Sequence, residues 1–298
     1  MSRKALLYGA SGFVGSGLAK MLTGKGYEVI GVSRKGHGNV KGILSWVTPE
    51  QADMAGKDII VNLAGSPIDQ RWTEEKKKEF YTSRVDVTDE IVAKIAALPE
   101  GQRPRLLLNS SAVGYYGGRG DELITEGSTP GTGFLADLCV KWEEAARKAE
   151  PLGVRVVTVR TGVVLGKGGA AYEKLVTVFK MGIGGRLGDG EQWMPWIHIK
   201  DLRRAMIFAI ETDAVTGPIN GTAPNPERNI DLSQKLADAV NRWVFLPVPG
   251  FALKIALGEF AEFLLQGQKA IPSKIQDHGF EFKFAKLEDA LHNLTASE

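Results

Sequence analysis

The sequence has one cysteine, almost no net charge and no long apolar run, and each shortage excludes a class of protein. Cys139 alone cannot form an internal disulfide or a metal site built on several thiolates. The 37 basic and 35 acidic residues leave a net charge of +2, too small to favour nucleic acid or an anionic membrane as the main partner. The four histidines are not paired at ligand spacing, so we expect no bound metal.

Membrane and export signals are also lacking. No stretch reaches the roughly 20 uninterrupted apolar residues of a membrane span. The longest apolar segment, 245–265, is broken by two prolines and by Lys254, Glu259 and Glu262. The N-terminus enters an apolar strand directly, without the apolar length or the cleavage site of a signal peptide. We therefore expect a cytoplasmic protein.

Short apolar runs alternate with amphipathic stretches through the first half of the chain. Apolar runs without polar alternation are typical of strands buried on both faces, and their alternation with helices indicates a parallel sheet with right-handed crossovers. We expect strands at 5–8, 28–32, 58–63, 105–110 and 154–159, and helices at 12–22, 74–97 and 133–149. This pattern predicts an α/β fold with a doubly wound parallel sheet of the Rossmann type.

After about residue 161 this rhythm breaks. Glycines crowd 162–190, and the residues from about 245 onward are mostly helical in pattern. We predict a cofactor-binding Rossmann domain at 1–160. The remainder, 161–298, would be mixed, with segments that return to the sheet and a smaller, mostly helical substrate lobe that includes a tail at about 245–298.

A glycine-rich turn joins the first expected strand to the first expected helix. Its glycines are Gly9, Gly12 and Gly15. The first permits a tight turn, the second lets a pyrophosphate approach the unpaired N–H groups of the helix N-terminus, and the third allows close packing of helix on strand. The turn, including Ser11, Phe13 and Val14, is thus a predicted dinucleotide site.

The end of the second strand bears on which nicotinamide cofactor would bind. Enzymes that use NAD usually carry a carboxylate there for the ribose 2′-hydroxyl. This chain has Ser33, Arg34 and Lys35 instead. A guanidinium can bind a 2′-phosphate with two hydrogen bonds, so we predict NADP(H), although the two cations could also be solvated surface charges.

Several segments together resemble the extended short-chain dehydrogenase/reductase family over nearly the whole chain. They are 9–15, Asn62-Leu63-Ala64-Gly65, Ser110-Ser111-Ala112, 160–166 and 188–202. Three others, Arg71-Trp72-Thr73, 111–117 and Lys141-Trp142-Glu143, resemble an atypical branch of "epimerase family" proteins. The resemblance implies the Rossmann fold and a nicotinamide cofactor, but no substrate.

The resemblance also implies further cofactor contacts. They would come from Leu63, Ala64, Gly65, Ser110, Lys141, Gly162 and Val163. Arg84 stands on the long helix where related enzymes often carry Asn near the pyrophosphate. Its guanidinium could contact phosphate or an acidic substrate.

The family's catalytic triad is incomplete in this chain. Ser111 matches the serine that polarises the reacting carbonyl, and Lys141 matches the lysine four residues after the catalytic tyrosine. Asp137 occupies the tyrosine position, where an ionised carboxylate would pair with Lys141 unless burial raised its pKa. It could equally be a solvated residue on the helix.

Tyr115 and Tyr116 follow Ser111 in a glycine-rich loop at the carboxyl end of a strand. Either could take over proton transfer, or both could pack against the pocket wall. Five residues are candidates for the substrate cleft: Arg160, Arg186, Gln192, Trp193 and Trp196. The tryptophans could stack on a flat or sugar ring or form an interface core, and His198 is interpreted as structural.

Three functions agree with these observations. The first is an NADP(H)-dependent oxidoreductase acting on a small polar substrate. The second is an epimerase or dehydratase of the nucleotide-sugar type, which the segment 188–202 favours. The third is a non-catalytic NADPH-binding sensor or regulator, which Asp137 favours. The two helices by which related enzymes pair are highly charged here, so both monomer and homodimer are open.

Overall fold

A seven-stranded sheet forms the centre of the computed structural model, which describes residues 3–243 and 247–296. Its strand order is β11–β7–β5–β4–β1–β2–β3, and all neighbouring strands are parallel. The strands are β1 (Arg3–Tyr8), β2 (Tyr27–Val32), β3 (Ser45–Val47), β4 (Ile59–Asn62), β5 (Leu106–Ala112), β7 (Arg155–Thr161) and β11 (Gly217–Gly221). The strand order reverses between β1 and β4, and ligands of such sheets bind in the crevice beyond the carboxyl ends at this point.

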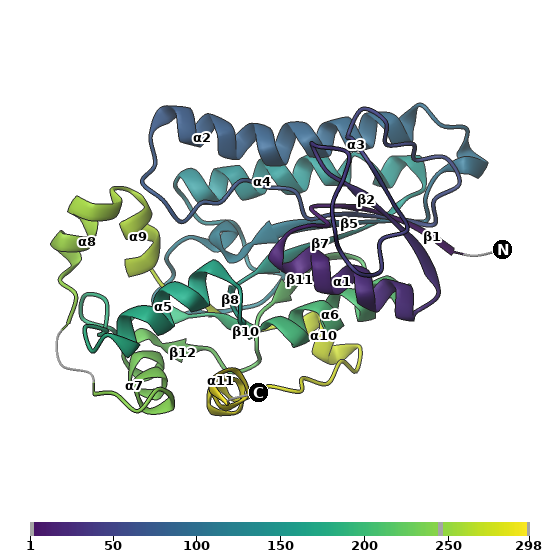
Figure 1. Ribbon diagram of the computed structural model, residues 1–298. Coiled ribbons are helices and arrows are strands. Elements are labelled where there is room, and N and C mark those ends of the chain that lie inside the picture. Colours follow the sequence, from purple (N-terminus) through teal and green to yellow (C-terminus); the bar gives the residue numbers. More distant parts are fainter. Residues whose placement is uncertain (1–2, 244–246, 297–298) are drawn as a thin grey trace.

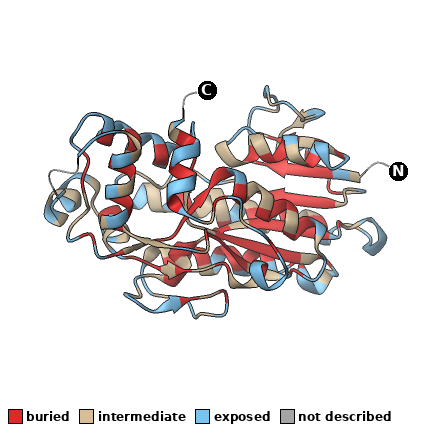
Figure 2. Ribbon diagram, turned by 90° about the horizontal axis from the view of Figure 1, so that it is seen from below, coloured by how far each residue is buried: buried red, intermediate tan, exposed pale blue. Residues whose placement is uncertain are grey.

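Helices cover both faces of the sheet (Figure 1). On one face α1 (Phe13–Gly24) packs against α6 (Ile199–Glu211). The other face carries α2 (Glu74–Tyr81), α3 (Val87–Ala96) and α4 (Phe134–Arg147). Figure 2 shows the strands as buried and the outer sides of the helices as exposed. Because both faces are covered, all four residues of β4 are buried and none alternates toward water.

The helices α2 and α3 are two parts of one long helix. A π-helical turn, Thr82–Asp86, joins them and contains Arg84. Phe80 of α2 packs in an aromatic cluster with Phe260, whereas Ile91 of α3 packs on the sheet. Turns of this kind are frequent at functional sites.

Besides β11 and α6, the described part of the second half of the chain contributes six α-helices and most strands of three two-stranded pairs. The pairs are β8 (Val163–Leu165) with β10 (Trp196–His198), β9 (Trp193–Met194) with β12 (Glu227–Arg228), and β6 (Leu123–Ile124) with β13 (Lys269–Ala270). The helices are α5 (Ala170–Lys180), α7 (Asn229–Ala239), α8 (Gly250–Leu257), α9 (Phe260–Leu265), α10 (Ser273–Asp277) and α11 (Leu287–Thr295). Tyr172, Trp196 and Leu232 belong to a second core in this part.

The predicted doubly wound parallel sheet is confirmed. Segments beyond residue 161 return to it, since β11 pairs with β7 and α6 packs on α1. The division into 1–160 and 161–298 stays a prediction. The expected start of the helical tail, near 245, lies outside the described residues, and α8 begins at Gly250. No helix in the described parts of the chain combines the length and hydropathy needed to cross a membrane.

Candidate functional site

The glycine-rich turn has the geometry expected of a phosphate cradle. Gly9 has a φ of +71°, and a Cβ on it would lie 2.6 Å from the carbonyl oxygen of Leu63. A Cβ on Gly15 would lie 2.3 Å from the carbonyl oxygen of Gly9. The turn closes with a 3.0 Å hydrogen bond from the Gly12 N–H to the Gly9 carbonyl. Side chains at these positions would push β1, β4 and α1 apart.

The N-terminus of α1 is left open to an anion. Gly12 is its N-cap residue, no side chain caps it, and its first turn has no acidic residue. Arg203 of α6 donates to the carbonyl oxygens of Phe13 and Val14, which places a cation beside this end of the helix. Free N–H groups, the helix dipole and a nearby guanidinium all favour a bound anion.

The end of β2 carries the predicted cationic residues. Ser33 donates its hydroxyl to the carbonyl oxygen of His37 at 3.0 Å, whereas Arg34 and Lys35 are exposed. The charge of Arg34 reaches Glu79 of α2: it contributes to the lowered pKa of that carboxyl, although the hydrogen bond from Lys76 contributes most. Arg34 therefore stands between the end of β2 and α2, at the border of the crevice.

Arg84 reaches across from the π-helical turn to the segment after β4. It donates to the carbonyl oxygen of Ser66 at 2.8 Å, and a Cβ on Gly65 would lie 3.1 Å from its guanidinium carbon. Its guanidinium also lies over the ring of Trp142, 5.4 Å from the centroid. Burial lowers the pKa of Arg84. The hydrogen bonds of this cation go to carbonyl and hydroxyl oxygens among the described residues, so its charge can still pair with a bound anion.

Apart from Lys141, the remaining predicted cofactor residues lie along the same edge of the sheet. Leu63 and Ala64 follow β4, and the Leu63 N–H donates to the Tyr8 carbonyl at 3.1 Å. Ser110 lies near the end of β5. Gly162 directly follows β7, and Val163 is the first residue of β8. The fold thus brings together, at one crevice edge, segments that are up to about 150 positions apart in the sequence.

The carboxyl end of β5 leads into a buried polar network. Ser111 donates its hydroxyl to Glu143 Oε1 at 2.7 Å. The carboxylate of Glu143 accepts two hydrogen bonds of 2.8 Å from Arg160, and both side chains are almost fully buried. Arg160 also donates to the Tyr116 hydroxyl at 3.0 Å, and that hydroxyl donates to Asn220 Oδ1 at 2.6 Å.

The pKa values in this network follow from its burial and pairing. Burial alone would lower the pKa of Arg160, but the carboxylate of Glu143 outweighs it and raises that pKa. Burial raises the pKa of Tyr116 to about 12. Tyr116 is fully buried, whereas Tyr115 is half-buried and its ring lies against the Arg160 guanidinium, 3.5 Å from centroid to guanidinium carbon. Of the two tyrosines, the structure therefore leaves Tyr115 the more accessible.

The structure does not bring Asp137 and Lys141 to Ser111. Both are exposed on α4, and the ammonium of Lys141 lies 5.5 Å from the ring centroid of Tyr81. The face of α4 that meets the end of β5 carries Cys139 and Glu143 instead, and burial raises the pKa of Cys139 to about 12. Positions 137 and 141 are two residues out of step with this face, and two residues turn a helix by about 200°. In this structure the two side chains therefore lie away from Ser111, and a catalytic role for them stays a prediction.

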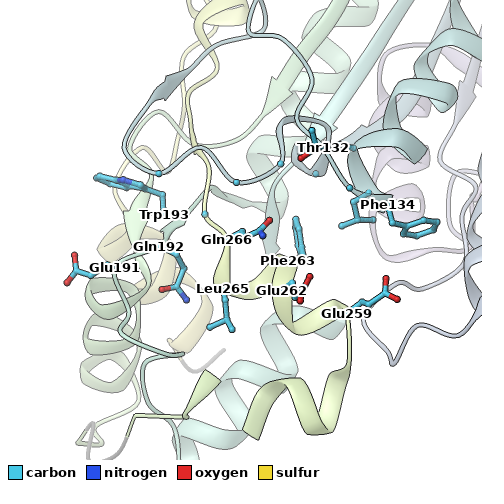
Figure 3. A pocket seen from close by; sticks show the side chains of 18 of the residues that line it. Thr132, Phe134, Glu191, Gln192, Trp193, Glu259, Glu262, Phe263, Leu265 and Gln266 are labelled. Atoms are coloured by element: carbon cyan, nitrogen blue, oxygen red, sulfur yellow. The ribbon is translucent and has the colours of Figure 1, made fainter. Parts of the chain in front are cut away.

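A cavity of about 710 Å³ opens next to the end of β5 (Figure 3). Its wall includes the loop around Gly117, the start of α4 at Phe134, the loop 189–193 and α9. Figure 3 places Glu262 and Phe263 of α9 between Phe134 and Gln192. The cavity therefore lies between the sheet part and the helices of the second half.

Two of the five residues predicted for the substrate cleft line this cavity, Gln192 and Trp193. The other three are not among its lining residues. Arg160 is held by Glu143, the fully buried Trp196 donates to the Asn225 carbonyl at 2.9 Å, and Arg186 packs beside Gly190. Trp196 is core, which is the alternative that its pattern left open.

The sequence prediction missed the contribution of α9 and of the start of α4 to the cavity. Glu262 and Phe263 come from α9 and Glu259 directly precedes it, so all three are remote in sequence from the loop around Gly117. The missed partner of Ser111 had a local signal. On α4 the apolar residues Leu138, Cys139 and Trp142 mark the buried face, and Glu143 lies within it.

His198 has the structural position expected of it. It is fully buried at the start of α6, its Nδ1 accepts from the Lys200 N–H at 3.0 Å, and its ring stacks on Phe284. Burial lowers its pKa to about 4. The described residues contain no group of three or more His, Cys, Asp or Glu side chains that could hold a metal ion.

Comparison with protein families decides the classification. The model described as "NAD dependent epimerase/dehydratase family" matches residues 5–220, and a domain of unknown function, DUF1731, matches 248–294. The chain belongs to the NAD-dependent epimerase/dehydratase family. The family match spans the glycine-rich turn, the π-helical turn and the buried network.

Members of the family from distant organisms are similar along the whole chain. The chloroplastic "Epimerase family protein SDR39U1 homolog" of Arabidopsis thaliana is 40% identical over 292 residues, which are 95% of this chain and 84% of the relative. The solved structure of human epimerase family protein SDR39U1 (isoform 2) with NADPH has a TM-score of 0.88 at 33% identity and covers 98% of this chain and 99% of that one. These matches confirm the predicted atypical branch of the extended short-chain dehydrogenases/reductases.

The fold is also similar to that of a solved sugar-nucleotide epimerase. UDP-glucuronic acid 4-epimerase from Bacillus cereus, in complex with UDP-glucuronic acid and NAD, has a TM-score of 0.76 at 16% identity and covers 98% of both chains. At this identity the likeness shows the fold alone.

Proposed function

We propose that the protein is an NADP(H)-dependent oxidoreductase that acts on a small molecule in the cavity beside β5. One observation carries the proposal: the open N-terminus of α1, the cationic end of β2 and the cavity all lie at the carboxyl edge of one parallel sheet. Ligands of such sheets bind there.

The residues fit the cofactor without displacement of the chain. Gly9 and Gly15 leave no room for side chains, which keeps the turn tight, and the start of α1, uncapped by any side chain, suits a pyrophosphate. Arg34 is exposed and suits a ribose 2′-phosphate, and Arg84 adds a positive charge beside Gly65. A relative of 33% identity has been solved with NADPH, which supports the same choice here.

When bound, the nicotinamide supplies or accepts a hydride. The protein's own contribution would be to bind the substrate and to move a proton. Tyr115 is our candidate for the proton, because the Tyr116 hydroxyl is enclosed between Arg160 and Asn220. Ser111 would accept a hydrogen bond from the hydroxyl of the alcohol form of the substrate, since its own proton is directed to Glu143.

The test is a fluorescence titration of the purified protein with NADPH and NADH, repeated on Arg34→Glu. We expect NADPH to bind more tightly, and the variant to lose roughly tenfold to a hundredfold in NADPH affinity with little change for NADH. Lys25→Glu, the same charge change at an exposed site after α1, is the control. Equal affinity for both nucleotides in the unmodified protein would contradict the proposal.

A second candidate is a non-catalytic NADPH-binding protein. The observation that favours it is the Ser111 hydroxyl, which is engaged by buried Glu143, together with the outward position of Asp137 and Lys141. Single-turnover assays with NADPH and a panel of small carbonyl compounds separate the two. Oxidation of NADPH that is abolished by Tyr115→Phe supports the oxidoreductase, and full NADPH binding without oxidation supports the binding protein.

The nucleotide-sugar epimerase or dehydratase is the third candidate, and the family match favours it. Such an enzyme reduces and reoxidises its cofactor within one site. Conversion of UDP-glucose or UDP-glucuronic acid without net change in nicotinamide absorbance would support it over the other two.

A further inference from the structure

The walls of the cavity are rich in carboxylates. Five acidic residues are among its lining residues: Asp121, Asp189, Glu191, Glu259 and Glu262. Among the lining residues that the structure describes, Arg228 is the single Lys or Arg. An anionic ligand would therefore meet mostly like charge.

Arg228 is not free to receive an anion. Its guanidinium pairs with Asp121 at 2.8 Å and with Glu191 at 3.1 Å. It also lies over the ring of Trp193, 4.7 Å from the centroid. A ligand phosphate would have to displace two carboxylates to reach it.

Two lysines just outside the lining reduce the negative charge but do not cancel it. Lys77 pairs with Glu259 at 2.8 Å, and Lys254 lies 3.7 Å from Glu262. Arg228 and Lys269, whose ammonium lies over the lining Trp193, bring the total to four positive charges against five negative ones, which leaves a net charge of −1 around the cavity. The balance favours a cation, and water and salt weaken this preference at the rim.

The aromatic residues of the wall already accept cations. The ammonium of Lys77 lies 5.4 Å from the ring centroid of Phe134, and that of Lys269 lies 4.5 Å from the centroid of Trp193. Trp72 and Phe263 add two further rings to the lining. Aromatic faces flanked by carboxylates are the usual chemistry of organic ammonium recognition.

Gln192 adds a hydrogen-bond acceptor to this wall. It is 9% exposed, and its Nε2 donates to the carbonyl oxygens of Leu187 and Leu264 at 3.1 and 3.2 Å, which fixes the orientation of the amide. Its Oε1 is buried and has no hydrogen-bond partner among the described residues. A buried acceptor without a partner is costly, and an N–H donor on a ligand would satisfy it after a small rotation of the amide toward the cavity.

We propose that the cavity takes a small organic cation, with an ammonium or comparable group among its carboxylates and rings, and that it rejects nucleoside diphosphate sugars. This rests on the proposed function in so far as the cavity is the substrate site. The diphosphate of a nucleotide sugar would bring negative charges to a cavity that is already negative and in which no described lining Lys or Arg is unpaired.

The experiment is a calorimetric titration of the protein, with and without NADPH, using three probes: benzylammonium, benzyl alcohol and UDP-glucose. We expect the ammonium probe to bind at least about tenfold more tightly than the uncharged alcohol, and UDP-glucose not to bind in the cavity. The double variant Glu259→Gln, Glu262→Gln should weaken the ammonium probe about tenfold and leave benzyl alcohol unchanged.

The matched control is Glu100→Gln, Glu144→Gln, which removes the same charge at exposed positions outside the lining. The proposal is overturned if the ammonium probe binds no better than the alcohol, if both double variants weaken it equally, or if UDP-glucose binds more tightly than the ammonium probe. NADPH affinity is measured in the same samples. If NADPH binds normally but the ammonium probe does not bind, the cofactor proposal stands and only the cation proposal fails. If neither NADPH nor the ammonium probe binds, the result counts against both proposals.

Discussion

Two arginines of this protein are each held by carboxylates, in opposite surroundings. Arg160 and Glu143 are 3% and 0% exposed at their side chains and join through two parallel hydrogen bonds. Arg228 pairs with Asp121 and Glu191 at the cavity rim, where the exposures are 28%, 71% and 62%. These two sites therefore show the same chemical pair in the interior and in water.

The difference lies in what happens when one partner is lost. Water can replace a missing carboxylate at the rim, whereas nothing in the interior can replace Glu143. The interior pair thus specifies how α4, β5 and β7 fit together, because Ser111 and Tyr116 bond to it as well. The rim pairs shape the electrostatic field of the cavity and contribute little to folding.

The largest expected effect is that of Glu143→Ala. The variant leaves the Arg160 guanidinium buried without a counter-charge, which should lower the free energy of unfolding by about 3–5 kcal/mol in urea titrations. Glu144→Ala, on the exposed side of the same helix, should change it by less than about 0.5 kcal/mol. The double variant Glu143→Met, Arg160→Met should recover most of this loss in unfolding free energy. Similar losses in Glu143→Ala and Glu144→Ala would refute the role of burial.

His198 sharpens the comparison, since it is buried without a carboxylate hydrogen-bonded to its ring. Its pKa is about 4 in the folded state against 6.5 for the free side chain, because burial disfavours the charged form. The unfolded chain therefore takes up the proton first, and stability falls as the pH drops from 6.5 toward 4, by up to about 3 kcal/mol.

His198→Asn keeps an N-cap acceptor for α6 and removes this titration. Between pH 7 and pH 4.5 the variant should lose less stability than the unmodified protein, as urea midpoints at both pH values would reveal. His292→Asn, at an exposed position, is the control. Identical pH dependence in the unmodified protein and His198→Asn would exclude this histidine as the source.

Tyr116→Phe tests the edge of the interior network. It leaves Asn220 Oδ1 and one N–H of Arg160 without their partner and should cost about 1–3 kcal/mol of unfolding free energy. Tyr115→Phe should have a smaller effect on stability, because this ring is half-buried. Thermal unfolding of the two variants side by side is the measurement, and a larger loss in Tyr115→Phe would invert our assignment.

The smallest expected effect is that of Glu191→Gln at the rim. We expect a loss of less than about 1 kcal/mol, which should shrink further at high salt. Chemical unfolding at low and high salt measures it. A loss of unfolding free energy that is large, or that does not change with salt, would contradict the difference proposed between the buried and the exposed arginine sites.

The sheet and the phosphate turn could be predicted because their signals are local. Gly9, Gly12 and Gly15 follow an apolar run and precede an amphipathic one, and the structure places them between β1 and α1 as expected. Buried parallel strands leave continuous apolar runs in the sequence, so β1, β4 and β5 were found within two residues of their ends.

The catalytic pair and the cavity were harder for a physical reason. The family pattern put Asp137 and Lys141 in the active register, but the side of α4 that meets Ser111 is set by packing, with Cys139 and Glu143 inward. The apolar periodicity of α4 indicates this inward face, but the prediction followed the family motif instead. The part played by Glu262 could not be foreseen, because no local pattern indicates which distant helix closes a cavity.

The π-helical turn Thr82–Asp86 has a consequence for tolerance to deletions. It holds one residue beyond what an α-helix needs, and one residue corresponds to a rotation of about 100° about the helix axis. It therefore sets the angular phase between α2, whose Phe80 faces the aromatic cluster, and α3, whose Ile91 faces the sheet. A chain shortened by one residue here could form a regular helix, yet it would swing Phe80 and Arg84 away from their neighbours.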